Sequence, residues 1–345
     1  MQLLRRRAYA RAGLVGNPSD GYNGRTISLI IRDLWAEVVL YEWDEVEILW
    51  SSQDKSRFQS VKDLAHDVRL HGYYGGVRLV KATIKRFVEY CEQQELKLHD
   101  RNFSIRYQSS IPRNVGLAGS SAIIVATLRA LMDFYEVRIP VEIQPSLALS
   151  VETRELGITG GLQDRVIQCF EGLVSMDFSR ERMATRNGYE FGVYERLDPQ
   201  SLPPIYVAYC DEMGEPTEVI HNNLRQRYDR GDSDVVNAMK TFAGLAEEAR
   251  WAVLNRDQET LARLINKNFD TRRSICQLHA GHIEMIERAR KVGASAKFAG
   301  SGGAIVGTYS DDAMLNRLKQ ELSQIGCVVF KPTIGEGSTN QAPAA

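Results

Sequence analysis

The stretch GLAGSSA (residues 116–122) is followed directly by the apolar run IIVATLRAL (residues 123–131). Two glycines and two hydroxyl groups therefore stand immediately before a segment that looks like a buried helix. One interpretation is a loop that ends at a serine helix cap. The other is an anion site, because glycines let backbone N–H groups crowd together and a helix N-terminus carries a favourable potential.

The composition of the chain is that of an ordinary soluble globular protein. Its 345 residues are long enough for two domains, with 43% hydrophobic and 25% charged residues. The formal net charge is -1, and Arg5–Arg7 is the one dense basic cluster. We therefore expect no nucleic-acid partner and place this cluster at the start of a strand.

Cysteine usage and the N-terminal sequence bear on the cellular compartment. The five cysteines are scattered and form no CxxC pair, which predicts neither a zinc site nor a disulfide framework. A reducing, cytoplasmic location fits this pattern best. The first residues are basic without a following apolar segment, and no apolar run approaches the roughly 18 residues of a membrane span. We expect neither a signal peptide nor a membrane partner.

Hydrophobic patterning predicts a mixture of strands and helices. Before a proline-rich segment at 198–204, we expect strands at 9–15, 26–31, 36–41, 46–50, 103–107 and 173–176, and helices at 76–93, 123–131, 145–157 and 163–170. After it, we expect strands at 205–209, 296–298, 304–308 and 327–331, and helices within 217–292 and at 312–325. This pattern predicts an α+β fold in two layers, with domains at 1–200 and 201–334 and a disordered tail at 335–345.

Three glycine-bearing segments recur along the chain, RAGLVGNPSDG (11–21), IPRNVGLAGSSA (111–122) and SAKFAGSGGA (295–304). Each alone is weak, since most glycine turns are simply turns. The sequence has no Gly-Lys dipeptide of a Walker A loop and no GxGxxG fingerprint. It also lacks the HRD and DFG elements of protein kinases.

In this order and spacing the three segments resemble the signature motifs of the GHMP kinase family, which includes galactokinase, homoserine kinase, mevalonate kinase and phosphomevalonate kinase. The central family motif runs Pro, a few residues, Gly-Leu, one residue and Ser-Ser-Ala, and here Ala118-Gly119 adds one residue. Many members carry Gly-Glu-His where this chain has Gly16-Asn17-Pro18. That difference, with ELGITGGLQDRV (155–166) and GLVSMDFS (172–179), favours the branch that acts on uronic acids.

The resemblance implies a fold and an activity. The fold would be a two-domain GHMP kinase fold, with a ribosomal-S5-like N-terminal domain and a ferredoxin-like C-terminal domain, and with ATP and substrate meeting between them. The activity would be ATP- and Mg²⁺-dependent phosphorylation of the anomeric hydroxyl of a sugar acid, D-glucuronate. The alternatives are another sugar, such as a heptose phosphate or fucose, and a catalytically silent member that binds metabolites or partners.

Two residues carry the implied chemistry. Asp164 in GLQD matches the catalytic carboxylate of the family, which lies close to the attacking hydroxyl and takes up its proton. An isolated Asp at this place would more simply complement a helix dipole. Arg11 matches the basic residue of the first motif, and a cation there would offset charge on the transferring phosphoryl group.

The resemblance also implies a nucleotide site and a metal site. Magnesium takes oxygen ligands and keeps waters beside one or two protein groups, and we assign it to Ser121 and Glu152, with Ser120 and Glu155 as the alternatives. The nucleotide site is expected at Pro112, Gly116, Leu117, Ala118, Gly119, Ser120, Ser121, Ala122, Gly300, Ser301 and Gly302.

Substrate contacts are expected next to the first motif and the catalytic Asp, at Asn17, Asp20, Arg25, Gly161 and Gly302. A uronic acid carries a carboxylate, for which Arg is a bidentate partner. Arg25 is one candidate for this role, and Arg272 and Arg273 are the others. The pair His279 and His282 has metal-ligand spacing but no third ligand nearby, so we do not assign it a metal.

Overall fold

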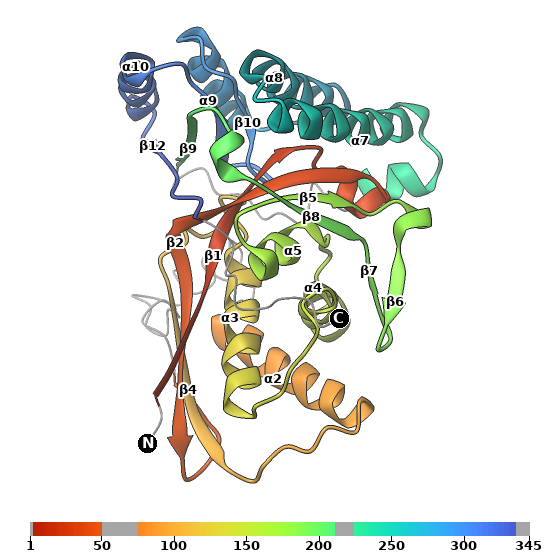
Figure 1. Ribbon diagram of the computed structural model, residues 1–345. Helices are drawn as coiled ribbons and strands as arrows, with labels where there is room; N and C mark the ends of the chain where they lie inside the picture. The colour runs from red at the N-terminus through yellow and green to blue at the C-terminus, as the bar shows by residue number, and fades with distance from the viewer. Residues whose placement is uncertain (1–2, 50–74, 211–223, 336–345) are drawn as a thin grey trace, which may run out of the picture.

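The computed structural model describes residues 3–49, 75–210 and 224–335. Within these ranges the chain forms two main sheets, one of six strands and one of four, with helices packed against both. Figure 1 shows the larger sheet running the height of the molecule, with the smaller sheet and its helices at the top. The predicted α+β class is confirmed.

The six-stranded sheet is organised around one long strand, β2 (Arg25–Trp43). Strand β1 (Leu3–Val15) pairs with it antiparallel along one edge. The other edge is shared by β4 (Asn102–Ser109) and β5 (Leu173–Asp177), which pair with opposite halves of β2. Strands β3 (Glu47–Leu49) and β8 (Val193–Leu197) add to β4 and β5 and complete the sheet.

The two strands predicted at 26–31 and 36–41 are one continuous strand, and that prediction was wrong. The polar residues Arg32 and Asp33 looked like a turn. In the structure Tyr9 pairs with Trp35 while Ala10 pairs with Ile31, so residues 32–34 bulge out against β1. A bulge bends a strand without ending it, because the extra residues lie outside the ladder.

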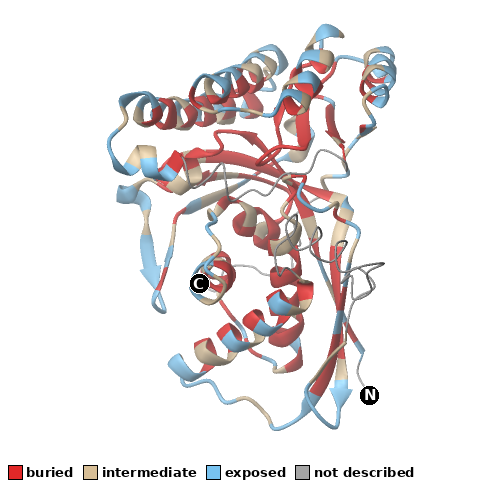
Figure 2. Ribbon diagram, turned by 180° about the vertical axis from the view of Figure 1, so that it is seen from behind, coloured by how far each residue is buried: buried red, intermediate tan, exposed pale blue. Residues whose placement is uncertain are grey.

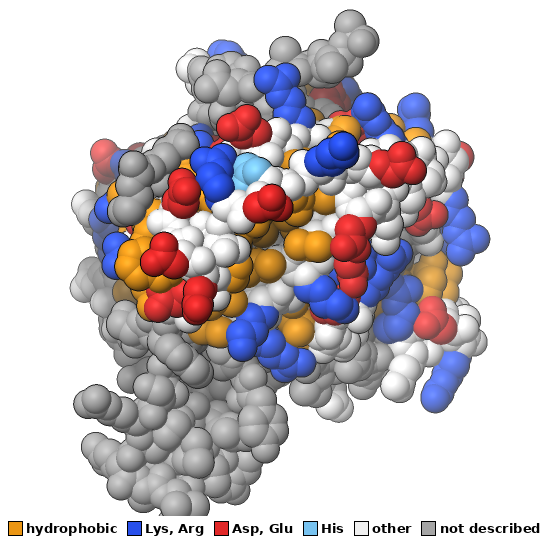
Figure 3. All heavy atoms as spheres, turned by 90° about the horizontal axis from the view of Figure 1, so that it is seen from below, with side chains coloured by type: hydrophobic (Ala, Val, Ile, Leu, Met, Phe, Trp, Pro, Cys, Tyr) orange, Lys and Arg blue, Asp and Glu red, His pale blue; other side chains and the backbone are white. Residues whose placement is uncertain are grey.

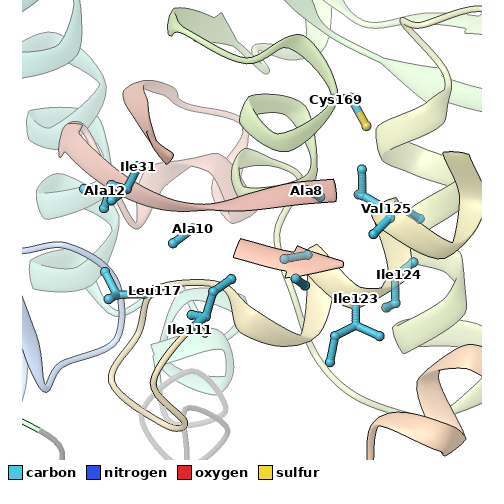
Figure 4. Close-up of a cluster of buried hydrophobic side chains, with 14 of the residues drawn as sticks. Ala8, Ala10, Ala12, Ile31, Ile111, Leu117, Ile123, Ile124, Val125 and Cys169 are labelled. Carbon is cyan, nitrogen blue, oxygen red and sulfur yellow. The ribbon is translucent and has the colours of Figure 1, made fainter. Parts of the chain in front are cut away.

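Four helices cover one face of this sheet: α2 (Gly76–Gln93), α3 (Gly119–Phe134), α4 (Gln144–Ser150) and α5 (Gln163–Phe170). Helix α3 is buried almost all round, as Figure 2 shows. It contacts β1, where Ala8, Ala10 and Ala12 alternate, and Figure 4 shows these alanines opposite the apolar side chains of α3 and of the loop before it. Small strand residues let the helix approach the sheet closely, so the loop at 111–118 is fixed against β1.

The helix predicted at 145–157 ends differently from the expectation. After α4 the chain continues as a π-helical turn, η2 (Val151–Glu155), before the glycines at 160–161. Such turns often occur at functional sites because they redirect side chains. The strands β6 (Ala184–Arg186), β7 (Tyr189–Phe191) and β8 were not predicted, although the β-formers in YEFGVYERL gave a signal.

The four-stranded sheet has the order β10-β11-β9-β12 and is antiparallel throughout. It consists of β9 (Ile205–Tyr209), β10 (Lys297–Phe298), β11 (Ala304–Thr308) and β12 (Val328–Phe330). The helices of this part are α7 (Ser233–Leu254), α8 (Gln258–Ile275), α9 (Ala280–Lys291) and α10 (Asp312–Ser323).

The predicted division at 200/201 lies between the last strand of the larger sheet and the first strand of the smaller one. The division into two domains remains a prediction. The predicted helix start at 217 lies outside the described residues, as does the predicted tail from 336 onward. Strand β1 begins at Leu3, six residues before the predicted start at 9. The other predicted strands and helices agree with the structure to within a few residues.

On the lower face of the molecule, acidic and basic side chains are interspersed with apolar ones (Figure 3). This mixing agrees with the net charge of -1. Among the described residues, no helix combines the length and apolar character that crossing a membrane requires.

Candidate active site

Arg11 on β1 joins all three glycine-bearing segments. Its guanidinium is buried, and Nε donates a hydrogen bond to Oδ1 of Asp164 at 2.7 Å. Nη1 donates to the carbonyl oxygen of Gly116 at 2.6 Å and to that of Ala299 at 3.2 Å. One side chain from the first segment therefore contacts the second segment, the third segment and the N-terminal turn of α5.

The second and third segments also touch through their backbones. Gly116 has a φ of +72°, and a Cβ there would lie 2.8 Å from the amide nitrogen of Ser301. A Cβ on Gly300 would collide with the carbonyl oxygen of Gly116 and lie 2.8 Å from Nη1 of Arg11. These glycines are required by close approach, because no side chain fits between the two loops.

Two buried basic residues, Arg272 and Lys297, fix the third segment to its neighbours. Arg272 on α8 donates to the carbonyl oxygens of Gly300 (2.6 Å) and Ser301 (2.9 Å). Lys297 donates to the carbonyl oxygens of Gly13 and Phe298 and to Oδ1 of Asn17. Burial lowers the pKa of Lys297 well below its usual value, and the nearby guanidinium groups lower it further.

These contacts give Arg272 and Asn17, two candidates for substrate binding, a structural role, and they identify Asn268 as a further residue with that role. Arg272 ties the third segment to α8, and the side chain of Asn17 ties the first segment to Lys297 on β10. Asn268 on α8 completes the tie, since its Oδ1 accepts from the amide of Gly16 at 2.6 Å. Lys297 was missed, although a lone lysine inside an apolar glycine segment was a visible signal.

Asp20 brings a second carboxylate to this region. It lies on the short 3-10 turn η1 (Ser19–Tyr22), and its Oδ2 accepts a bond from the amide of Gln163 at 3.4 Å. A Cβ on Gly161 would collide with that oxygen, so the glycine makes room for the carboxylate. Burial and, to a smaller extent, the negative charge of Asp164 raise the pKa of Asp20 to about 6.

The π-helical turn places Glu152 against the start of α3. Its Oε1 accepts a bond from the hydroxyl of Ser120 at 2.9 Å, and its Oε2 forms a buried ion pair with Nη2 of Arg165. Arg165 also donates to the carbonyl oxygen of Gly161 at 2.8 Å. Sequence reasoning missed Arg165, although it directly follows Asp164 in the sequence.

The four residues considered as magnesium ligands have different partners in the structure. The hydroxyl of Ser121 lies 3.2 Å from the carbonyl oxygen of Ala118, within its own turn, and does not bond to Glu152. The carboxylate of Glu155 bonds to Nζ of Lys85 on α2 at 2.6 Å. Ser120 and Glu152 are the pair that the fold brings together.

Helix α3 begins without a side-chain cap. Its N-cap residue, Ala118, has a φ of +62° and provides no side-chain acceptor for the first N–H groups. Uncapped N–H groups at a helix N-terminus can bind an anion. The other expected nucleotide residues lie in this loop or in the first turn of the helix: Pro112, Gly116, Leu117, Gly119, Ser120, Ser121 and Ala122.

The remaining candidates contact other residues. Nε of Arg25 bonds to Oδ2 of Asp177 at 2.8 Å, and the exposed Arg273 pairs with Glu287 on α9 at 3.0 Å. His279 caps α9, and a Cβ on Gly302 would lie 2.7 Å from Nδ1 of His282. Among the described residues, no group of three or more His, Cys, Asp or Glu side chains is arranged to hold a metal.

Comparison with known proteins gives consistent results. Residues 78–172 match the family model described as GHMP kinases N terminal domain. The chain is 46% identical to glucuronokinase 1 of Arabidopsis thaliana, over 88% of this chain and 84% of that protein. It is 44% identical to probable glucuronokinase 2 of the same plant, over 94% of this chain and 89% of that protein. Its fold is similar to that of Lactococcus lactis galactokinase complexed with galactose, with a TM-score of 0.73 and 14% identity, over 99% of this chain and 95% of that one.

Proposed function

This chain belongs to the GHMP kinase family and is an ATP-dependent sugar kinase, and from that premise we propose that its acceptor is D-glucuronate. The products would be glucuronate 1-phosphate and ADP. Support for the substrate comes from the two relatives at 46% and 44% identity, both of which are named as glucuronokinases. The observation that carries the chemistry is the 2.7 Å bond between Arg11 and Asp164 where the three glycine segments meet.

In the proposed mechanism, the carboxylate of Asp164 orients the anomeric hydroxyl and accepts its proton as the phosphoryl group is transferred. Arg11 fixes the orientation of that carboxylate through Nε. Through Nη1 it holds Gly116, in the loop before α3. The uncapped N-terminus of α3 binds phosphate oxygens of ATP. The loop at 298–301 closes the other side of the site, because Arg11, Lys297 and Arg272 hold its carbonyl groups.

We propose that Mg²⁺ is held by the hydroxyl of Ser120 and the carboxylate of Glu152. The fit rests on donor chemistry, since both are oxygen donors hydrogen-bonded to each other at the first turn of α3. Magnesium usually binds few protein groups and completes its shell with waters and substrate phosphates. When bound, it would neutralise charge on the β- and γ-phosphates.

The metal site can be tested by Mg²⁺ titration of activity at saturating ATP. Ser120→Ala and Glu152→Gln should each raise the Mg²⁺ concentration at half-maximal activity by about tenfold, since each removes a ligand oxygen or its charge. Ser121→Ala and Glu155→Gln are the matched controls and should leave the midpoint within about twofold. Thermal melts would show whether Glu152→Gln disturbs the buried pair with Arg165. Unchanged midpoints in both test variants would exclude this pair as the metal site.

The substrate assignment is tested by following ADP release with glucuronate, galacturonate, glucose, fucose and a heptose phosphate. We expect kcat/KM for glucuronate to exceed that for glucose by about 10³, because a site built for a carboxylate leaves its cation unpaired when a hydroxymethyl group binds. Equal use of glucose and glucuronate would exclude the proposed substrate. ADP release with none of the sugars would instead support a catalytically silent protein.

We further propose a reducing, cytoplasmic location. All five cysteines are free thiols, and four of them are buried.

A further inference from the structure

The three arginines considered for the substrate carboxylate are each bonded to other groups. Arg25 pairs with Asp177, Arg272 bonds to loop carbonyls, and Arg273 pairs with Glu287. If the substrate is glucuronate, its carboxylate still requires a cationic partner near the first motif. Leaving that charge unpaired in a closed site would be costly.

Arg225 contacts the end of the first motif. Its Nη2 donates to the carbonyl oxygen of Gly21 at 2.5 Å, and its guanidinium lies over the ring of Tyr22, 4.6 Å from the ring centroid. Tyr228, one turn further along the same helical segment, packs against Tyr22 with ring centroids 4.7 Å apart. The helical segment 224–229 is therefore fixed against η1 by aromatic contacts, and Arg225 is held in a defined place.

A short series of contacts links Arg225 to Asp164. Asp20 touches Gly161 and Gln163, directly before Asp164, and Gly21 is the next residue after Asp20. The order along this side of the site is therefore Asp164, Asp20 and Arg225. In glucuronate the anomeric carbon and the carbon that bears the carboxylate flank the ring oxygen, and their substituents diverge, so a hydroxyl placed at Asp164 leaves the carboxylate to a cation further along the site.

Arg225 also has the electrostatics for this role. Its side chain is 44% exposed, and its carboxylate partner among the described residues is Asp229, with Oδ1 3.8 Å from Nη1. That separation is beyond hydrogen-bond distance, and Asp229 is itself 60% exposed. A guanidinium carries five N–H donors in a fixed fork. The bond to Gly21 engages Nη2 and orients the fork. As far as the described residues show, the other N–H donors of Arg225 remain for a substrate carboxylate.

We propose that Arg225 is the specificity residue that binds the carboxylate of the sugar acid, from its place beside Gly21 and Tyr22. This inference rests on the proposed function, since it assigns a partner to a group that only a uronic acid carries. It also explains why Arg25, the candidate next to the first motif in the sequence, does not serve: the required side chain comes from a helical segment that is distant in sequence and packs on η1.

The test measures kcat and KM for glucuronate and glucose in the wild type, Arg225→Met, Arg225→Lys and the control Arg230→Met. Arg230 is an exposed arginine of the same segment, just after its helical part. Arg225→Met should lower kcat/KM for glucuronate by at least about 100-fold, mainly through KM, because the carboxylate loses its partner in the bound state. Its kcat/KM for glucose and KM for ATP should stay within about threefold of wild type. For Arg225→Lys we expect a kcat/KM for glucuronate between those of the wild type and Arg225→Met. The control Arg230→Met should have the kinetic constants of the wild type.

The outcomes separate the inference from the function on which it rests. A wild-type enzyme that prefers glucuronate, combined with an Arg225→Met variant that keeps this preference, would overturn the role of Arg225 alone. Equal losses for glucuronate and glucose would also overturn it, since they would indicate a structural effect. A wild-type enzyme without preference for glucuronate would overturn the proposed function, and the inference with it. Melting temperatures of the Met and Lys variants, compared with Arg230→Met, check that the fold is intact.

Discussion

The Asp164→Asn variant is expected to lose at least about 10³-fold of the wild-type turnover while binding ATP with nearly unchanged affinity. An amide cannot accept the proton of the attacking hydroxyl, so the transition state loses about 4 kcal/mol of stabilisation. The substitution is close to isosteric, and its amide oxygen can still accept the bond from Nε of Arg11. The loss should therefore fall on kcat and leave the architecture of the site intact.

This prediction is checked by steady-state kinetics and by calorimetric binding of a non-hydrolysable ATP analogue. Asp270→Asn is the matched control, because Asp270 also accepts a 2.7 Å bond from an arginine, Arg290, but lies on the surface. The control should keep wild-type turnover. An Asp164→Asn enzyme with more than about a tenth of wild-type turnover would remove this residue from the proton-accepting role.

Replacing Arg11 by Met is expected to reduce turnover by at least about 100-fold and to lower the free energy of unfolding by about 3 kcal/mol. The stability loss follows because the buried guanidinium is the partner of Asp164 and of two loop carbonyls, which would be left unsatisfied. The activity loss follows because Asp164 and the loop at Gly116 would no longer be held in fixed positions relative to each other. Kinetics and urea unfolding measure the two effects separately.

Arg11→Lys serves as the conservative variant. Its ammonium keeps the charge but cannot reproduce the geometry of Nε and Nη1, so we expect it to recover part of both losses. In the double variant Arg11→Met with Asp164→Asn, the turnover losses should be far from additive, because Arg11 acts through Asp164. A stable Arg11→Met enzyme with wild-type turnover would contradict a catalytic role for the pair.

The sequence predicted most elements, but it misjudged β2. Arg32 and Asp33 have the composition of a turn, and only pairing with β1 and β4 shows that the chain stays extended through them. Their side chains find partners far away in sequence, since Arg32 pairs with Glu171 and Asp33 accepts a bond from the amide of Thr333. Local composition cannot encode such distant partners.

The choice between Ser120 and Ser121 shows the limit of motif reasoning. Consecutive residues in a helix point in directions about 100° apart, since a turn takes about 3.6 residues. A shift of one residue therefore decides whether a hydroxyl faces Glu152 or its own turn. The added residue in GLAGSSA left open in the sequence which of the two serines faces Glu152. In the structure, the packing of α3 on β1 directs Ser120 toward it.

The sequence by itself determined the α+β class, the residue types of the catalytic region and the family to which the chain belongs, because glycines, hydroxyls and carboxylates at fixed spacing are local properties. Tertiary structure alone decided which groups meet: the side chains of Ser120 and Glu152, those of Lys297 and Asn17, and the guanidinium of Arg225 with the carbonyl oxygen of Gly21. Each of these contacts joins segments at least 30 residues apart. Their geometry depends on how helices and strands pack, and packing is set by the whole buried core and not by any short stretch of sequence.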